Sequence, residues 1–530
     1  MPRHLRRLLL SAFLVLVATS ACTVGPSSRP PLAVYGGPTT QATTASAAPS
    51  GMPTGPGGPG RDVDPIRWTD CPGDVSPDSD GTSFTLECGV IRVPVSYTNG
   101  GQVLSLEVAR ARAPGVGEDA ENLVVIQGTP GRTGHDAVAS VAAALPESLR
   151  KTFAVIILDL RGTGDSAVAS CLSLNSIRRL VASDADPSAG QAAERMQNTA
   201  RQLTFDCTDN VGPNLSSYDT TAAADDLDNL RAALGTATLN VLGQGYGATL
   251  GAIYADRYPG RVGRMVLDSP DDPLAAPDER AKARAAALDT ALDEFSRSCA
   301  DFAGGCPLGD QPRDKITSML TVLNDGQVAD NGLLITAGSV LLLLSDLLGD
   351  QDSWPELATA LNAAAGGDVN PIAAMITDHW QITSVQNLFD GEIVYGCNDT
   401  TQRLPPSEAA TRAAALPADD LFGRFLIGQV SVCSAWPAPD QPLGRVAGTG
   451  ARPILVLGAV DDPVTPYDGI RSVSGQLASA KLVSWQSGQH GAFPGGSCMN
   501  DVVAGYLTEG HLPATGTLCP PRPWPVRAYR

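Results

Sequence analysis

Short apolar runs without polar alternation recur in two parts of this chain. Residues 154–158 form such a run, and the run at 239–242 is interrupted only by Asn240; each leads into a polar or glycine-rich turn. A continuous apolar run of this length is typical of a parallel strand that is covered on both faces. Between the two runs, Leu227, Leu230 and Leu234 form the apolar stripe of an amphipathic helix. Strands that alternate with helices predict an α/β fold with a mostly parallel central sheet and helices on both faces.

The middle of the chain has a different pattern. From about residue 276 to 430, alanine- and leucine-rich helical segments follow one another, as in SWPELATALNAAAGG. The most apolar of them, LLITAGSVLLLLSDLLGD, is interrupted by Gly338, Ser345 and Asp346, which favours a lid helix over a membrane span. Strand and turn patterns return at 451–466. The simplest account is a helical insertion between two parts of one sheet.

The N-terminus predicts export. Residues 1–21 combine arginines, an apolar stretch and small residues, as a signal peptide does, and they are too short for a comfortable membrane span. The sequence TSAC at 19–22 resembles a bacterial lipobox, so we expect Cys22 to become a lipid-bearing N-terminus; ordinary signal cleavage nearby is the alternative. The following Pro-, Gly-, Ser- and Thr-rich stretch is expected to be a disordered tether between a membrane surface and the folded part.

A chain of 530 residues is too long for one ordinary core. We divide it into a signal peptide (1–21), a tether (22–65), a first part of the core (66–275), a helical lid (276–430) and a C-terminal part of the core (431–530).

Charge and cysteine usage narrow the partners. The net charge is −19, and removal of residues 1–21 takes away three arginines and no acid, so the mature chain is more negative still. Such an acidic protein repels the phosphate backbone, which argues against nucleic acid as a partner. No Cys/His cluster has metal-ligand spacing, so we expect no metal and no cofactor.

Of the eleven cysteines, the ten other than Cys22 fall into neighbouring couples, which suggests a disulfide framework. The alternative is that two or three of them are buried thiols. The predicted couples are Cys71 with Cys88, Cys171 with Cys207, Cys299 with Cys306, Cys397 with Cys433, and Cys498 with Cys519.

The stretch VLGQGYGATL, residues 241–250, has the layout of a nucleophile elbow, in which the serine of G-x-S-x-G stands at a strand-to-helix turn. Here the residue at the apex of the turn is Gly245. Glycine has no side-chain oxygen, so a covalent acyl-enzyme at this position is impossible. Glycine does suit the strained backbone of such a turn.

Two later residues fit the order nucleophile, acid, histidine that this layout requires. Asp462 follows a late strand in VDDPVTP, with Asp461 as the adjacent alternative, and His490 follows the last predicted strand in SGQHG. An oxyanion hole in this layout uses two backbone N–H donors. We expect one from Thr129, in a glycine-rich loop after an early strand, and the other from Tyr246, just after the apex. For the remaining histidines we expect structural or surface roles: His4, His135, His379 and His511.

With these residues in order, the chain resembles the exported α/β-hydrolase-fold serine peptidases of actinobacteria, the tripeptidyl-aminopeptidase-like group related to prolyl aminopeptidases. The resemblance spans about residues 65–525 and rests on TPGRTG, DLRGTGDS, GQGYGATLGAIYADRYPGRVGRMVLDSPDDP, VYGCND, CSAWP, ILVLGAVDDPVTPYDG, GQHGAF and YLTEGHLPATGTLC. It implies removal of short peptides from free N-termini, with a helical lid restricting access. The triad of the family corresponds to Gly245, Asp462 and His490.

Three residues depart from the family pattern: Gly245, where G-x-S-Y-G has serine, Thr129, where glycine is usual, and Ser269, where LDG is usual. Ser269 has no elbow context, and Ser166 in GTGDS follows the wrong strand, so neither is expected to be the nucleophile.

Three functions remain open. The first is a degenerate hydrolase that binds short peptides or peptide-like ligands in the retained cleft. The second is a working hydrolase that uses water activated by His490, or a serine from elsewhere. The third is a scaffold of the cell envelope without a ligand cleft.

Overall fold

The computed structural model describes residues 63–71, 83–98, 101–128, 133–166, 171–302, 304–382 and 388–521. The predicted signal peptide, Cys22, all but the last residues of the predicted tether, and Thr129 lie outside these residues.

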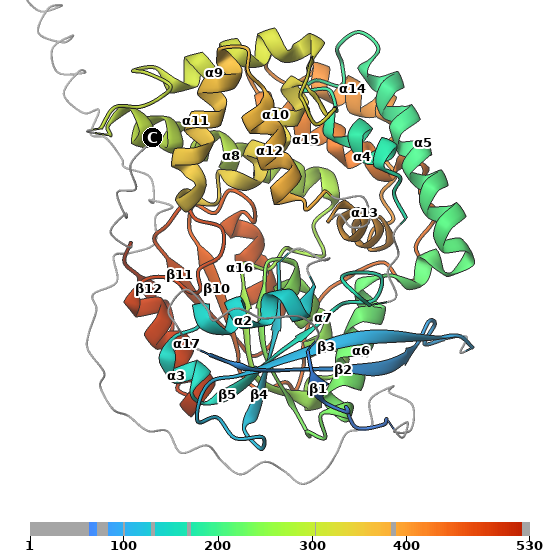
Figure 1. Ribbon diagram of the computed structural model, residues 1–530, viewed down its shortest axis with the longest axis vertical. Helices are drawn as coiled ribbons and strands as arrows, with labels where there is room; N and C mark the ends of the chain where they lie inside the picture. The colour runs from blue at the N-terminus through green and yellow to red at the C-terminus, as the bar shows by residue number, and fades with distance from the viewer. Residues whose placement is uncertain are drawn as a thin grey trace, which may run out of the picture. The chain divides into compact units, whose positions relative to one another are not determined.

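A ten-stranded sheet forms the centre of the fold, in the order β1-β2-β3-β5-β4-β6-β7-β10-β11-β12 (Figure 1). The pairs from β5 to β12 are all parallel, and β1, β2 and β3 pair antiparallel at one end. The mostly parallel sheet predicted from the sequence is therefore confirmed. The strands are β1 Thr69–Asp70, β2 Thr85–Pro94, β3 Val103–Arg112, β4 Glu121–Ile126, β5 Phe153–Leu158, β6 Leu239–Gln244, β7 Val262–Asp268, β10 Ile454–Ala459, β11 Ala480–Trp485 and β12 Leu518–Cys519.

Both faces of the sheet are covered, which explains the unbroken apolar runs. Every residue of β5 and of β10 is buried. Successive side chains of a strand point to opposite faces, so Val124 belongs to one apolar cluster, and Leu123 and Val125 belong to the other. The first cluster contains α6 (Thr220–Ala233), α7 (Tyr246–Arg257) and α16 (Tyr467–Gln476), and the second contains α2 (Gly134–Ala144), α3 (Glu147–Arg150) and α17 (Ser497–Glu509).

The remaining helices form what we call the helical layer, and most of their buried apolar residues make up a third apolar cluster, while Ala409 and Ala413 of α14 belong to a smaller fourth one. Figure 1 shows them gathered above the sheet in the view drawn. The layer is larger than the insertion predicted at 276–430, because α4 and α5 come from the segment between β5 and α6, and their residues Ile177 and Leu203 pack in the same cluster. The helices are α4 Leu174–Val181, α5 Ala192–Val211, α8 Pro277–Ala300, α9 Pro312–Val322, α10 Ala337–Leu347, α11 Trp354–Ala365, α12 Asn370–His379, α13 Phe389–Asn398, α14 Pro406–Ala414 and α15 Leu421–Gln429. The short strands β8 (Gln327–Val328) and β9 (Leu334–Ile335) pair within the same insertion.

All five predicted cysteine couples are disulfides, so the pairing predicted from the sequence is confirmed. The alternative, in which some of these ten cysteines stay as buried thiols, is therefore wrong. Such a disulfide framework is typical of exported proteins. The bonds join Cys71 to Cys88, Cys171 to Cys207, Cys299 to Cys306, Cys397 to Cys433, and Cys498 to Cys519.

The disulfides cross-link both the sheet region and the helical layer. The bond from Cys71 to Cys88 ties the segment after β1 to β2, and the bond from Cys498 to Cys519 ties α17 to β12. The other three lie in the helical layer, where Cys207 of α5 and Cys397 of α13 are fully buried. Within the described ranges, no helix is both long enough and apolar enough to cross a membrane.

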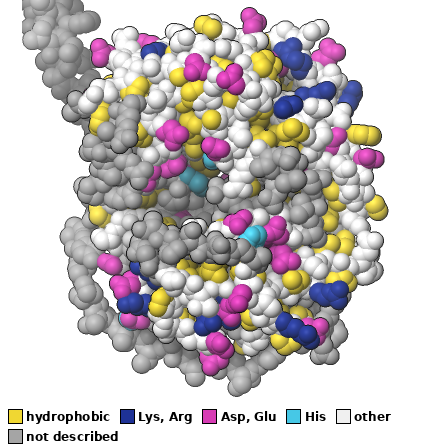
Figure 2. Space-filling model, in the orientation of Figure 1, with side chains coloured by type: hydrophobic (Ala, Val, Ile, Leu, Met, Phe, Trp, Pro, Cys, Tyr) yellow, Lys and Arg dark blue, Asp and Glu magenta, His cyan; other side chains and the backbone are white. Residues whose placement is uncertain are grey.

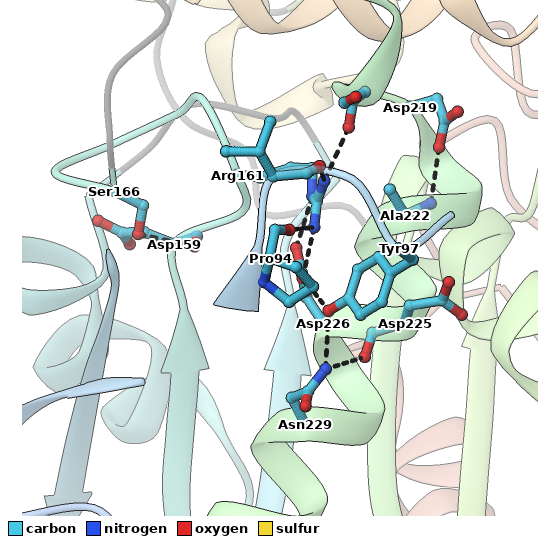
Figure 3. A network of polar contacts seen from close by, with 12 residues as sticks. Pro94, Tyr97, Asp159, Arg161, Ser166, Asp219, Ala222, Asp225, Asp226 and Asn229 are labelled. Atoms are coloured by element: carbon cyan, nitrogen blue, oxygen red, sulfur yellow. Dashed lines mark hydrogen bonds and ion pairs between the residues drawn. The ribbon is translucent and has the colours of Figure 1, made fainter. Parts of the chain in front are cut away.

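A buried ion pair fixes the loop after β5 to α6. The guanidinium of Arg161 donates two hydrogen bonds of 2.7 Å to the carboxylate of Asp226, and both side chains are fully buried. It also donates to the carbonyl oxygens of Val95 and Ser217, while the hydroxyl of Tyr97 donates to Asp226 at 2.6 Å (Figure 3). This network joins the edge of the sheet, the DLRGTGDS loop and α6, so it holds the segment that leads into the helical layer.

We predict that Arg161→Met lowers the free energy of unfolding by about 3–5 kcal/mol, because Asp226 would keep an unpaired charge in the core. The matched control is Arg195→Met, since Arg195 pairs with Asp184 at 2.6 Å but is 57% exposed, and its loss should cost about 0–1 kcal/mol. Urea denaturation followed by circular dichroism measures both. Equal losses in the two variants would contradict the structural role of Arg161.

Candidate active site

Gly245 forms a one-residue turn between β6 and α7, as the pattern of residues 241–250 predicts. Its backbone has φ 51° and ψ −118°, a conformation that glycine adopts without steric cost and other residues rarely adopt. Its N–H donates to the carbonyl oxygen of Asp268 at 2.8 Å. The flanking glycines are required because a Cβ on Gly243 would lie 2.4 Å from the carbonyl oxygen of Gly247, and one on Gly247 would lie 2.2 Å from that of Ile126.

A side chain at residue 245 would point at a histidine. An ideal Cβ on Gly245 would lie 3.4 Å from Nε2 of His490, and 3.2 Å from Cα of Gly128. The hydroxyl of a serine here would therefore lie within reach of the imidazole. The geometry of an elbow facing a histidine is present, although residue 245 has no side chain.

Asp462 orients this histidine. Its carboxylate oxygens lie 3.1 and 3.0 Å from Nδ1 of His490, and its Oδ1 accepts 2.9 Å bonds from the N–H groups of Val464 and Thr465. Asp462 is only 1% exposed, so the pair is shielded on the aspartate side. Of the two adjacent aspartates that the sequence left open, Asp462 is the one whose carboxylate is hydrogen-bonded to His490, and the N–H of Asp461 donates to the carbonyl oxygen of Ser487.

The surroundings of His490 favour its protonated form. Burial lowers the pKa of the imidazole, but the charge and the hydrogen bond of Asp462 raise it, and the charge of Asp268 adds to this. Arg284 in α8 acts in the opposite direction. The net result is a pKa of His490 above its ordinary value.

Two side chains that the sequence analysis missed hold the segment after His490. The carboxylate of Asp268, at the end of β7, accepts hydrogen bonds of 2.8 to 3.0 Å from the N–H groups of Ala492 and Phe493. The side-chain amide of Gln244, at the end of β6, donates to the carbonyl oxygen of Phe493 at 2.7 Å. The only indication in the sequence is the position of each residue at a strand end beside the elbow.

The oxyanion loop is only partly described. Thr129 lies outside the described residues, and the preceding Gly128 accepts a 3.1 Å hydrogen bond from the N–H of Tyr246 through its carbonyl oxygen. That N–H is the donor that we expected to face a ligand oxygen. In this structure the carbonyl of Gly128 occupies it, so a ligand oxygen would bind there only after this peptide turned away.

The other serines near the motifs are buried and hydrogen-bonded elsewhere. Ser269 is fully buried with φ 55°, and its hydroxyl lies 3.3 Å from Oδ1 of Asp268. Ser166 is also fully buried; it donates to the carbonyl oxygen of Asp159 and accepts from the N–H of Glu107 (Figure 3). Neither hydroxyl is open to a ligand.

Arg284 of the helical layer is close enough to influence His490 and belongs to a group of interacting ionisable residues, and we call Arg284, Asp346, His379 and Glu392 the layer cluster. Asp346 pairs with Arg284 at 2.7 Å and with His379 at 3.1 Å. Burial and the charge of Asp346 raise the pKa of Glu392 to about 7. The layer touches the site directly, because the N–H of His490 donates to the carbonyl oxygen of Gly349 at 2.8 Å. Figure 2 shows a hollow in the viewed face where histidine and acidic side chains are visible.

The other predicted surface or structural histidines have acidic neighbours away from Asp462. His135 pairs with Asp136 and Asp165, and His511 pairs with Glu509. Among the described residues there is no group of three or more His, Cys, Asp or Glu side chains placed to hold a metal ion.

Comparisons with known proteins agree with the fold. A family model described as an alpha/beta hydrolase fold matches residues 121–318, and a second, described as TAP-like protein, matches residues 419–519. Serine protease Hip1 of Mycobacterium tuberculosis is 29% identical over 484 residues, which cover 86% of this chain and 91% of that protein. Tripeptidyl aminopeptidase of Streptomyces lividans is 26% identical and covers 87% of both chains. Carboxylesterase B of Mycobacterium tuberculosis is 28% identical over 82% of this chain and 87% of its own.

We predict that thermal stability falls as the pH rises from 5.5 to 8. Burial raises the pKa of Asp159 to about 7 and the pKa values of Asp219 and Asp268 to about 6. A carboxyl whose pKa is raised on folding binds its proton more tightly in the native state, so the native state loses stability as the pH passes from the unfolded to the folded pKa. His490, whose pKa is also raised, contributes with the same sign.

Differential scanning calorimetry at several pH values measures this dependence. The Asp268→Asn variant should show a smaller fall in Tm than the native chain, and Asp468→Asn, at a 90% exposed side chain, should match the native chain. A Tm that stays level or rises from pH 5.5 to 8 would contradict the raised pKa values assigned to these buried carboxyls.

Proposed function

The chain belongs to the α/β-hydrolase peptidase family of actinobacteria, and we propose that it binds peptide-type ligands at the hydrolase site without the serine chemistry of its relatives. One observation carries this proposal. The Asp462–His490 pair is assembled, and the position facing Nε2 of His490 is a glycine, whose ideal Cβ would lie 3.4 Å from that nitrogen. The site is thus arranged around a nucleophile that Gly245 does not provide.

The missing hydroxyl rules out one mechanism at this position. An acyl-enzyme needs an oxygen or sulfur nucleophile, and Gly245 has none. The two serines nearest in the motifs, Ser269 and Ser166, are fully buried. Covalent catalysis by the described site therefore has no nucleophile, and ligand binding is the property that remains.

The names of the relatives support peptides as the ligand class. One is named a serine protease and another a tripeptidyl aminopeptidase. The resemblance of the sequence implies a free N-terminus on the ligand, and the layer cluster contains two acids that such an ammonium can contact. Its carboxylates, Asp346 and Glu392, lie on the helical layer beside Arg284, whose charge acts on His490. We propose that a short peptide spans from His490 to these acids.

Hydrolysis by water activated at His490 is the second candidate, favoured by the intact hydrogen bonds between Asp462 and Nδ1 of His490. A site without its triad nucleophile retains about 10³–10⁴-fold acceleration over water when its oxyanion hole works. The N–H of Tyr246 is bonded to Gly128, which weakens that contribution. One relative is named a carboxylesterase, so an ester substrate belongs to this candidate as well.

We propose the same location that the sequence predicts, an exported protein held at a membrane by a lipid on Cys22. The five disulfides support export. A cell-envelope scaffold without a ligand cleft is the third candidate.

Two measurements on the native protein test the proposal. Treatment with a serine-directed fluorophosphonate should leave it unlabelled, because among the described residues no serine hydroxyl is hydrogen-bonded to His490. Calorimetry with a panel of tripeptides should show binding at micromolar concentration, competed by a second tripeptide. Stoichiometric labelling would mean that another serine is the nucleophile, and an absence of binding across the panel would favour the scaffold.

A further inference from the structure

We propose that the ligands are product-like peptide acids, short peptides whose C-terminal carboxylate binds at Nε2 of His490. This ligand class presupposes the peptide-binding function above, because it uses the same site. It adds which end of the peptide meets the histidine and which chemical group that end must carry.

The orientation of the imidazole is the first support. Both carboxylate oxygens of Asp462 lie within 3.1 Å of Nδ1, so Nδ1–H donates to Asp462. Nε2 has no hydrogen-bond partner among the residues that the structure describes, and the side chain of His490 is 30% exposed. When the ring is protonated, Nε2–H is a charged donor without a protein acceptor. A carboxylate is the ligand group that gives such a donor its strongest hydrogen bond.

Gly245 is the second support. An ideal Cβ at this position would lie 3.4 Å from Nε2, so a serine hydroxyl attached to it would reach the nitrogen and occupy its hydrogen-bonding direction. With glycine, the donor stays available to a ligand. The same substitution that removes the nucleophile therefore creates a binding site for an anion.

The charges around His490 allow an additional anion. Asp462 faces Nδ1, on the other side of the ring from Nε2. Asp268, at the end of β7, is turned to the N–H groups of Ala492 and Phe493 rather than to the ligand side. Arg284 of α8 lies close enough to act on the pKa of His490 and brings a positive charge from the helical layer, where it pairs with Asp346.

The layer cluster provides a place for the opposite end of such a ligand. Of its two acids, Asp346 pairs with Arg284 and His379. Glu392, whose pKa is raised to about 7, carries most of its negative charge only above that pH, so the cluster favours an N-terminal ammonium more above pH 7 than at pH 6.0. A peptide with both termini free would then carry its negative end to His490 and its positive end to the helical layer. A peptide amide, which lacks the negative end, would lose one of these two contacts.

The test compares Ala-Ala-Ala, with a free carboxylate, and the same tripeptide as its C-terminal amide, by calorimetry with the native protein at pH 6.0 and pH 8.5. We expect the acid to bind about 10- to 100-fold more tightly than the amide at pH 6.0, as one charge-assisted hydrogen bond implies. The preference should be larger at pH 6.0 than at pH 8.5, because the imidazole of His490 carries its charge below its raised pKa and loses charge as the pH rises.

Three variants sharpen this comparison. His490→Gln should abolish the preference for the acid while the amide still binds, and His511→Gln, at a 75% exposed histidine, should leave it unchanged. Gly245→Ser should weaken binding of the acid, because the hydroxyl competes for Nε2.

Equal affinity of acid and amide in the native protein would overturn the proposed carboxylate site and leave peptide binding standing. Tighter binding of the amide would also overturn the carboxylate site without contradicting peptide binding. If neither tripeptide binds, and no member of the wider panel does, the proposed function itself fails. The comparison of acid and amide binding to the native protein needs no variant, so it remains decisive even if His490→Gln misfolds.

Discussion

The close approach of β6, α7 and β4 at residues 243–247 is the constraint on which the site depends. Gly243 and Gly247 have no room for a Cβ, because backbone atoms of Gly247 and Ile126 would lie closer than 2.5 Å to it. The chain therefore turns from strand to helix within a single residue, and this residue takes a positive φ. Everything at the site is arranged around the direction in which residue 245 would project a side chain.

The parts that surround this position are intact although the side chain is absent. His490 is oriented by Asp462, and the segment that follows it is clamped by Asp268 and Gln244 from the ends of two neighbouring strands. These hydrogen bonds involve backbone groups at the carboxyl edge of the sheet, so they also stabilise the fold. Under the proposed function, such a scaffold keeps the shape of its site without a nucleophile, because the residues that shape the site are held for structural reasons as well.

The local features of the site could be predicted from the sequence, and the long-range ones could not. The apolar runs indicated the buried strands, the glycine spacing indicated the turn at Gly245, and the chain order indicated Asp462 and His490. Strand β7 stops at Asp268, since Ser269 takes a positive φ that breaks the extended backbone, and nothing in the sequence marks that position. The disulfide pairing was predicted because the partners are neighbours in sequence.

The missed features each depend on segments far apart in the chain. Helices α4 and α5 join the helical layer although they precede the elbow strand by many residues, and nothing local marks their partners. The clamp by Asp268 links positions separated by more than two hundred residues. The bond between Tyr246 and Gly128 is a tertiary contact that uses only backbone atoms, and it leaves no trace in the identity of the side chains.

The most direct measurement is the hydrolysis of a tripeptide chromogenic amide by the Gly245→Ser variant beside the native protein, with Gly245→Ser/His490→Ala as the control. If the site is a hydrolase lacking one hydroxyl, the serine variant should exceed the native rate by about 10³-fold or more, and removal of His490 should cancel the gain. Comparable turnover by the native protein and the serine variant would contradict this account, because the chemistry would then take place without residue 245.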